Sequence, residues 1–228
     1  PDRHKDALAT ILRSGSHLLS LIDGLLDVAK IEAGKLRLEQ TEIPFPELLH
    51  DLELMFTTQA RDKGLRFHLE PLGALPAVVR GDEKRVRQIL INLLGNAVNF
   101  TDSGEVRLRV GYLRETATFE IIDTGIGIDP GQLERLFQPF ERGDLMRQDK
   151  GVGLGLTITR MLTSLMGGEL QVRSERDKGT CFQVRLYLPQ VRAPQAVVHV
   201  AHDIIGYDGP PQRVLVVDDH VDHRKVLS

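Results

Sequence analysis

The residues best suited to chemistry lie on one predicted helix, residues 82–99. Asn92, Gly95, Asn96 and Asn99 recur at i, i+3, i+4 and i+7, so they share one stripe of that helix. Asparagine competes with the helix backbone for hydrogen bonds, which makes three of them within two turns unfavourable. An amide oxygen is a hard, neutral ligand for Mg²⁺, and a glycine would let a bulky ligand lie against the backbone. The alternative is a solvated helix face that binds nothing.

A second candidate site directly follows a predicted strand, at Asp123-Thr-Gly125-Ile-Gly127. The carboxylate suits recognition of an amino group, and the two glycines let the backbone approach a flat ligand. An ordinary turn between a strand and a helix explains the same residues.

The third candidate is the run Gly151-Val152-Gly153-Leu154-Gly155, which leads into a predicted helix. Glycines at a helix N-terminus present backbone N–H groups and the positive end of the helix dipole to phosphate. Arg142, Arg147 and Lys150 lie just upstream and either reach over a polyphosphate or are solvated loop charges. No strand precedes the run and no βαβ unit surrounds it, so it is not a dinucleotide fingerprint.

The elements that position these residues are predicted from apolar periodicity. Residues 7–33 form one long helix whose apolar spacing, close to 3.5, is typical of a coiled coil or helical bundle, and Gly34 ends it. This stripe predicts either dimerisation or a missing neighbour. From about residue 44 the pattern is mixed. Helices are expected at 44–63, 82–99, 129–133 and 156–167, and strands at 65–69, 105–112, 116–123, 169–174 and 180–188.

Composition excludes several classes of protein. The chain has 228 residues, a net charge of −3 and 41% hydrophobic residues, which is typical of globular domains. The near-neutral charge argues against nucleic acid and anionic membranes as partners. The single cysteine, Cys181, makes no internal disulfide and is read as a half-buried bystander. Without an apolar run long enough for a membrane span, the chain is expected to be cytoplasmic and part of a longer, possibly membrane-anchored protein.

The order of the motifs is more specific than any one of them. A helix bearing asparagines, then Asp-x-Gly-x-Gly, then Phe137-Gln-Pro-Phe140, then Gly-x-Gly-x-Gly-Leu resembles the ATP-binding domain of sensor histidine kinases over residues 42–189. Residues 1–41 look like the second helix of a dimerisation and phosphotransfer hairpin. Residues 190–212 read as a linker, and 213–228 are similar to the first strand of a receiver domain. The whole resembles the centre of a hybrid sensor histidine kinase.

The resemblance implies a fold and a ligand. The fold is α+β, a two-layer α/β sandwich of the superfamily that includes gyrase and chaperone ATPases, preceded by a long coiled-coil-like helix. The ligand is ATP with Mg²⁺. Asn96 would bind the Mg²⁺ that bridges the phosphates, and Asn92 would contact phosphate from the same face. Asp123 would accept a hydrogen bond from the adenine amino group, and Thr180 would lie near the base.

The resemblance also implies a lid over the nucleotide. Gly125 and Gly127 would hinge the pocket, and Phe137 and Phe140 would anchor the base of the lid. The other lid residues of the ATP site would be Arg147, which meets the phosphates, and the run that closes over the triphosphate, namely Gly151, Val152, Gly153, Leu154 and Gly155.

Three positions bear on activity. Many members of the family carry Lys where this chain has Asn99 and Thr where it has Val152, so a reduced affinity for ATP is expected. Hydrolytic relatives, and kinases that phosphorylate serine, carry a Glu where this chain has Asn92, which has no useful basicity. Neutral imidazole needs little help as a nucleophile, so the chain is expected to transfer phosphate to histidine rather than to hydrolyse ATP.

The histidine that would accept phosphate belongs in a run such as Ser-His-Glu-Leu-Arg, and no such run occurs. The eight histidines are read as bystanders, His17 being the least improbable exception, so the chain is not expected to phosphorylate itself. The expected partners are a histidine-bearing hairpin helix and a second copy, both through residues 7–33, and a response-regulator receiver domain. One alternative is a catalytically degenerate nucleotide-binding module that regulates other kinases by pairing. Another, a chaperone-type or topoisomerase-type ATPase, is disfavoured by Asn92.

Overall fold

The structure, a computed structural model, describes residues 15, 22, 24–133, 136–137 and 155–191. A helix covers residues 24–32 and ends where the sequence predicts. Gly34 has a φ of +63°, its N–H donates to the Ile31 carbonyl, and the Lys35 N–H donates to the Lys30 carbonyl. A positive φ suits glycine, which lacks a Cβ. Apart from residues 15 and 22, the earlier part of the predicted helix 7–33 lies outside the described residues.

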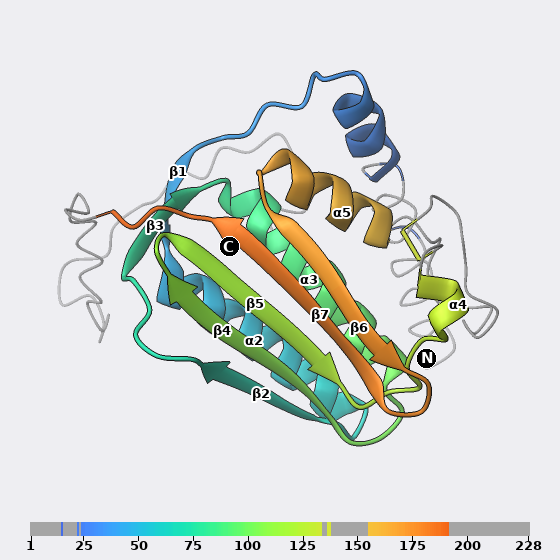
Figure 1. The fold of residues 1–228 in the computed structure, drawn as a ribbon. Coiled ribbons are helices and arrows are strands. Elements are labelled where there is room, and N and C mark those ends of the chain that lie inside the picture. Colours follow the sequence, from blue (N-terminus) through green and yellow to red (C-terminus); the bar gives the residue numbers. More distant parts are fainter. Residues whose placement is uncertain (1–14, 16–21, 23, 134–135, 138–154, 192–228) are drawn as a thin grey trace, which may run out of the picture. The chain divides into compact units, whose positions relative to one another are not determined.

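A five-stranded mixed sheet carries the rest of the fold (Figure 1). Its strand order is β2-β4-β5-β7-β6; the β2–β4 pair is parallel and the other pairs are antiparallel. These strands are β2 (Arg66–Pro71), β4 (Glu105–Leu113), β5 (Thr116–Asp123), β6 (Glu169–Glu175) and β7 (Gly179–Tyr187). A second, two-stranded sheet pairs β1 (Thr41–Pro44) with β3 (Val78–Gly81) in antiparallel fashion.

Three helices cover one face of the large sheet (Figure 1). They are α2 (Phe45–Asp62), α3 (Glu83–Phe100) and α5 (Gly155–Leu165); the short α4 (Pro130–Leu133) follows β5. The helices and the sheet form the two-layer sandwich that the resemblance implied.

The core lies between these two layers. Along β5, Ala117, Phe119 and Ile121 point inward and are fully buried, while the residues between them are partly exposed. The apolar face of α3 meets them, and every position predicted for that face is buried: Val86, Ile89, Leu90, Leu93, Leu94 and Ala97. Burying each large aliphatic side chain contributes about 1.5–3 kcal/mol, so this packing determines which face of α3 lies against the sheet.

The predicted elements are confirmed to within a few residues, but the sequence reading missed β1 and β3. Both strands have only four residues, and β1 ends in a proline. They pair over a separation of about 40 residues, from Thr41 with Gly81 to Pro44 with Val78, and no local pattern reveals such a pairing. In the described part of the chain, no helix is both long enough and apolar enough to cross a membrane.

Candidate functional site

Asp123 is a buried carboxylate in a position where the strand pattern calls for an apolar residue. It continues the inward series of β5 after Phe119 and Ile121, and only 6% of it is exposed. Its Oδ1 accepts hydrogen bonds from the Gly125 N–H at 2.9 Å and the Thr180 N–H at 3.2 Å. Burial raises the pKa of this carboxyl to about 6, although the two N–H groups partly offset the effect. A carboxyl whose pKa is shifted strongly by burial is a candidate for a functional site.

The two glycines after Asp123 are required by close packing. A Cβ on Gly125 would collide with the Phe100 carbonyl at the end of α3. Gly127 has a φ of +64°, and a Cβ there would collide with the Glu175 carbonyl at the end of β6. The loop is therefore held between α3 and the β6–β7 hairpin. The hinge role implied for these glycines stays a prediction.

Thr180 joins Asp123 to a small polar cluster on β6 and β7. The Oγ1 of Thr180 lies 2.8 Å from the Oγ of Ser174. The Ser174 Oγ is also 2.9 Å from the Gly179 carbonyl oxygen, and it accepts a hydrogen bond from the Ile128 N–H at 2.7 Å. Sequence reasoning missed Ser174, because a serine in a strand carries no motif by itself.

The asparagine stripe of α3 lies beside an open stretch of backbone. A Cβ built on Gly95 would meet no atom within 4 Å. Asn96 is half-buried and Asn99 is exposed, and the two residues lie one and four positions after this glycine on α3. A hard amide oxygen beside uncovered backbone fits a ligand that brings its own anionic oxygens and a cation.

Asn92, the first residue of the stripe, faces α5. Its Nδ2 donates to the Oγ1 of Thr159 at 2.6 Å, and its side chain fills the space that a Cβ on Gly155 would occupy. The structure thus brings two predicted site residues, Asn92 and Gly155, into contact at the start of α5. Thr159 was not anticipated, because it lies 67 residues away in the sequence.

Phe137 is half-buried next to α5. The Oγ1 of Thr157 donates to its carbonyl at 3.0 Å, and the guanidinium of Arg160 lies 5.2 Å from the centroid of its ring. This packing is consistent with an anchor for the segment that follows. The predicted site residues of that segment, Phe140, Arg147, Gly151, Val152, Gly153 and Leu154, lie outside the described residues.

A polar cluster joins the helix at residues 24–32 to α3. The Oδ2 of Asp27 accepts from Nη1 of Arg85 at 2.7 Å and from Nε2 of Gln88 at 3.0 Å. Only 13% of each charged side chain is exposed. Burial alone would raise the pKa of Asp27, but the hydrogen bonds from Gln88 and Arg85 hold it below its ordinary value. This cluster connects the N-terminal helix to the helix that carries the asparagines.

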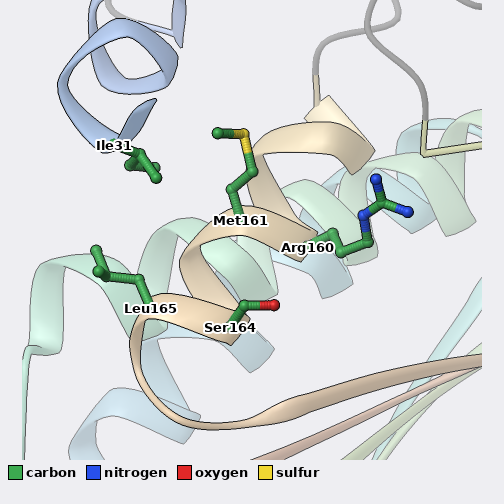
Figure 2. Close-up of a pocket in the computed structure, with 5 residues that line it drawn as sticks. All are labelled: Ile31, Arg160, Met161, Ser164 and Leu165. Carbon is green, nitrogen blue, oxygen red and sulfur yellow. The ribbon is translucent and has the colours of Figure 1, made fainter. Parts of the chain in front are cut away.

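A cavity of about 570 Å³ lies beside the same helix (Figure 2). Ile31 lines it from one side, and Arg160, Met161, Ser164 and Leu165 of α5 line it from the other. Among the described residues predicted for ligand binding, none lines it.

No group of three or more His, Cys, Asp or Glu side chains gathers into a metal site within the described ranges. Cys181 is half-buried, as predicted, and burial raises the pKa of its thiol.

Comparison with known proteins shows which proteins this chain is similar to. Residues 81–190 match the family described as histidine kinase-, DNA gyrase B-, and HSP90-like ATPase. The chain is 34% identical to the sensory/regulatory protein RpfC of Xanthomonas campestris over 98% of its own length and 35% of that protein. It is 38% identical to the aerobic respiration control sensor protein ArcB of Escherichia coli K12, over 93% of the chain and 27% of ArcB. The chain thus spans about a third of one relative and a quarter of the other.

A solved structure supports the same family match. Full-length ShkA in complex with AMPPNP superposes with a TM-score of 0.72 and 32% identity, covering 83% of this chain and 40% of ShkA. The two-layer sandwich is thus that of a histidine kinase-, gyrase- and HSP90-like ATPase. Within that family, the chain belongs to the hybrid sensor histidine kinases and carries the ATP-binding catalytic core of a two-component kinase.

Proposed function

We propose that this chain transfers the γ-phosphate of Mg·ATP to a histidine on a hairpin helix that the chain itself does not supply. The observation that carries the proposal is the buried carboxyl of Asp123, which ends β5 next to α3. Burial leaves it in need of a hydrogen-bond donor, and Oδ1 already accepts both backbone N–H groups. The adenine amino group is such a donor and would bond to Oδ2.

The metal would sit at Asn96. The amide oxygen of this residue is a suitable Mg²⁺ ligand, and the open backbone at Gly95 leaves room for the phosphates. Mg²⁺ would neutralise the charge that develops on the phosphates during transfer. The chain's own part is to position the nucleotide from both ends, with Asp123 at the base and α3 at the phosphates.

The choice of a histidine acceptor rests on Asn92. In the structure its amide donates to Thr159 and packs against Gly155, where it supports the start of α5. An amide does not remove a proton from water or a hydroxyl at neutral pH, so this position supplies no general base. A neutral imidazole needs none, which favours transfer to histidine over hydrolysis.

The N-terminal helix would bring the acceptor and a second copy. Ile22, Leu25 and Leu26 remain about half exposed, as expected for a stripe that packs on another helix. We propose the domain boundaries 1–41, 42–189, 190–212 and 213–228, the last being the start of a receiver domain. We also propose that this part of the parent protein works in the cytoplasm.

Incubation with γ-labelled ATP and Mg²⁺ tests the proposal. The chain alone should stay unlabelled, whereas an added hairpin that carries a Ser-His-Glu-Leu-Arg run should become labelled. Asn96→Ala should abolish labelling. Gln171→Ala, at an exposed position of β6, is the matched control and should leave labelling unchanged. Label on His17 of this chain, or steady ATP hydrolysis that Asn96→Ala removes, would contradict the proposal.

A second candidate is a regulatory module that binds nucleotide but does not catalyse transfer. Asn99 favours it, because many relatives carry a phosphate-facing Lys at that position. Under this alternative the chain binds Mg·ATP, yet the added hairpin stays unlabelled at every concentration tested.

A further inference from the structure

Lys63 places its ammonium group at the C-terminal end of α3. It is the C-cap residue of α2, and Nζ donates to the carbonyls of Val98 at 2.6 Å, Asn99 at 3.0 Å and Thr101 at 2.8 Å. The partial negative charge of a helix C-terminus favours a cation at this place, and charge-assisted hydrogen bonds are stronger than neutral ones.

The lysine completes the hydrogen bonding of that helix end. The last carbonyls of a helix have no partner within the helix. Here the Ala97 carbonyl accepts from the Oγ1 of Thr101 at 2.7 Å, and the Phe100 carbonyl accepts from the Ile126 N–H at 3.4 Å. Lys63 supplies the donors for Val98 and Asn99. Each carbonyl of the final turn therefore has a donor, and the donor from Lys63 is charged.

The backbone from which Lys63 projects is itself fixed. The N–H groups of Lys63 and Leu65 both donate to the Ala60 carbonyl, and Gly64 takes a φ of +72° to allow the turn. Leu65 then enters the core, with 5% of it exposed. The ammonium is thus held by a rigid helix end rather than by a mobile loop.

The final turn of α3 is where the two halves of the proposed nucleotide site meet. It carries Asn99, Asn96 lies directly before it, and its Phe100 carbonyl contacts the loop that begins at Asp123. Lys63 itself lies outside the matched residues 81–190.

We propose that Lys63 is a positioning residue for this site: its ammonium holds the last turn of α3 in the place where Asn96 and Asn99 meet the metal-bound phosphates. The inference rests on the proposed function. It concerns a residue that touches the helix and not the nucleotide.

The test compares Lys63→Met, which keeps the aliphatic stem, with Lys63→Arg, which keeps the charge and the donors. Lys84→Met, an exposed lysine in the first turn of α3, is the matched control. Affinity for Mg·ATP and for adenosine is measured by calorimetry on the full chain, at a temperature where every variant is folded. We expect about tenfold weaker Mg·ATP binding for Lys63→Met, as follows from losing charge-assisted hydrogen bonds, and changes below about threefold for the other two variants. Adenosine binding should change less than about threefold.

A merely structural role would lower the melting temperature without changing the affinity of the folded protein. The inference is overturned if Lys63→Met binds Mg·ATP within twofold of the wild type, or if adenosine binding falls as much as Mg·ATP binding. Should Lys63→Met not fold, Lys63→Gln replaces it under the same criteria.

Hydrogen exchange without nucleotide separates this inference from the proposed function. Lys63→Met should speed exchange at residues 99–103 and leave the middle of α3 unchanged. A wild type that fails to bind Mg·ATP would refute the proposed function alone. Unchanged exchange at the end of α3 would refute the role of Lys63 alone.

Discussion

Replacing Asp123 by asparagine should stabilise the unliganded protein at neutral pH and at the same time weaken its binding of nucleotide. The carboxyl is buried and its pKa is raised from 3.8 to about 6, so its ionised form is unfavourable in the folded state. An amide of the same shape can still accept the hydrogen bonds from Gly125 and Thr180 through its oxygen. It removes the buried charge, but it presents an N–H₂ group where the adenine amino group would need an acceptor.

The expected size follows from the pKa. The folded protein holds this proton more tightly than the unfolded chain, so the stability due to protonation is present below about pH 4 and is lost as the pH rises through about 6. Each pKa unit corresponds to about 1.4 kcal/mol, so the ionised carboxylate destabilises the folded state by about 3 kcal/mol at pH 8. At pH 4.5 the same calculation gives a destabilisation of the folded state of about 1 kcal/mol. Asp123→Asn removes this penalty, so its free energy of unfolding should exceed that of the wild type by up to about 3 kcal/mol at pH 8 and up to about 1 kcal/mol at pH 4.5. It should bind Mg·ATP about 10–100-fold more weakly, because the adenine amino group is left as a buried donor without an acceptor.

Urea unfolding of both proteins between pH 4.5 and pH 8 measures the stability difference, and calorimetry measures Mg·ATP affinity. Asp62→Asn, at an exposed carboxylate near the end of α2, is the matched control and should stay within about 0.5 kcal/mol of the wild type. The reasoning is refuted if Asp123→Asn destabilises the protein at pH 8, or if the stability difference does not shrink as the pH falls. An unchanged affinity for Mg·ATP would separately refute the proposed contact between Asp123 and adenine.

Other substitutions probe the remaining contacts. Asp27→Ala should lower the free energy of unfolding by about 1–3 kcal/mol and speed hydrogen exchange at residues 24–32. Asp51→Ala breaks a more exposed ion pair with Arg87 of α3 and should lower the free energy of unfolding by less than about 1 kcal/mol. Equal losses of stability in the two variants would contradict the importance of burial. Gly127→Ala should lower the free energy of unfolding in urea by at least about 2 kcal/mol, because this position has a positive φ and a Cβ there would collide with the Glu175 carbonyl. A variant as stable as the wild type would contradict this explanation. Asn99→Lys should tighten Mg·ATP binding about three- to tenfold in calorimetry at low salt, and no gain would show that the position does not face phosphate.

Local patterns predicted the elements that local chemistry decides. Asp82 caps α3, accepting from the Arg85 N–H at 3.0 Å, as an N-cap followed by an apolar stripe indicates. The strand at 116–123 is equally visible in the sequence, which places Asp123 at its end; that the carboxylate faces inward was learned from the structure.

Contacts between distant residues could not be predicted in the same way. The bridge from Asp27 to Arg85 spans 58 residues, and Lys63 reaches carbonyls 35 to 38 residues away. A lysine after a helix is usually solvated, and only the packing of α2 beside α3 gives this one a role. The glycine run of the lid was also recognised in the sequence, yet most of its residues lie outside the described ranges.

The small sheet has a mechanical consequence for a domain that sits within a longer chain. Val79, in the middle of β3, pairs with Ile43 on one side and with Gln190 on the other, and both neighbours run antiparallel to it. The segments by which the chain enters and leaves the sandwich are therefore parallel to each other and about 10 Å apart, two strand spacings. Tension applied through both would load the hydrogen bonds of β3 in shear rather than unzip them one by one. A pull applied through both segments would thus be carried across β3.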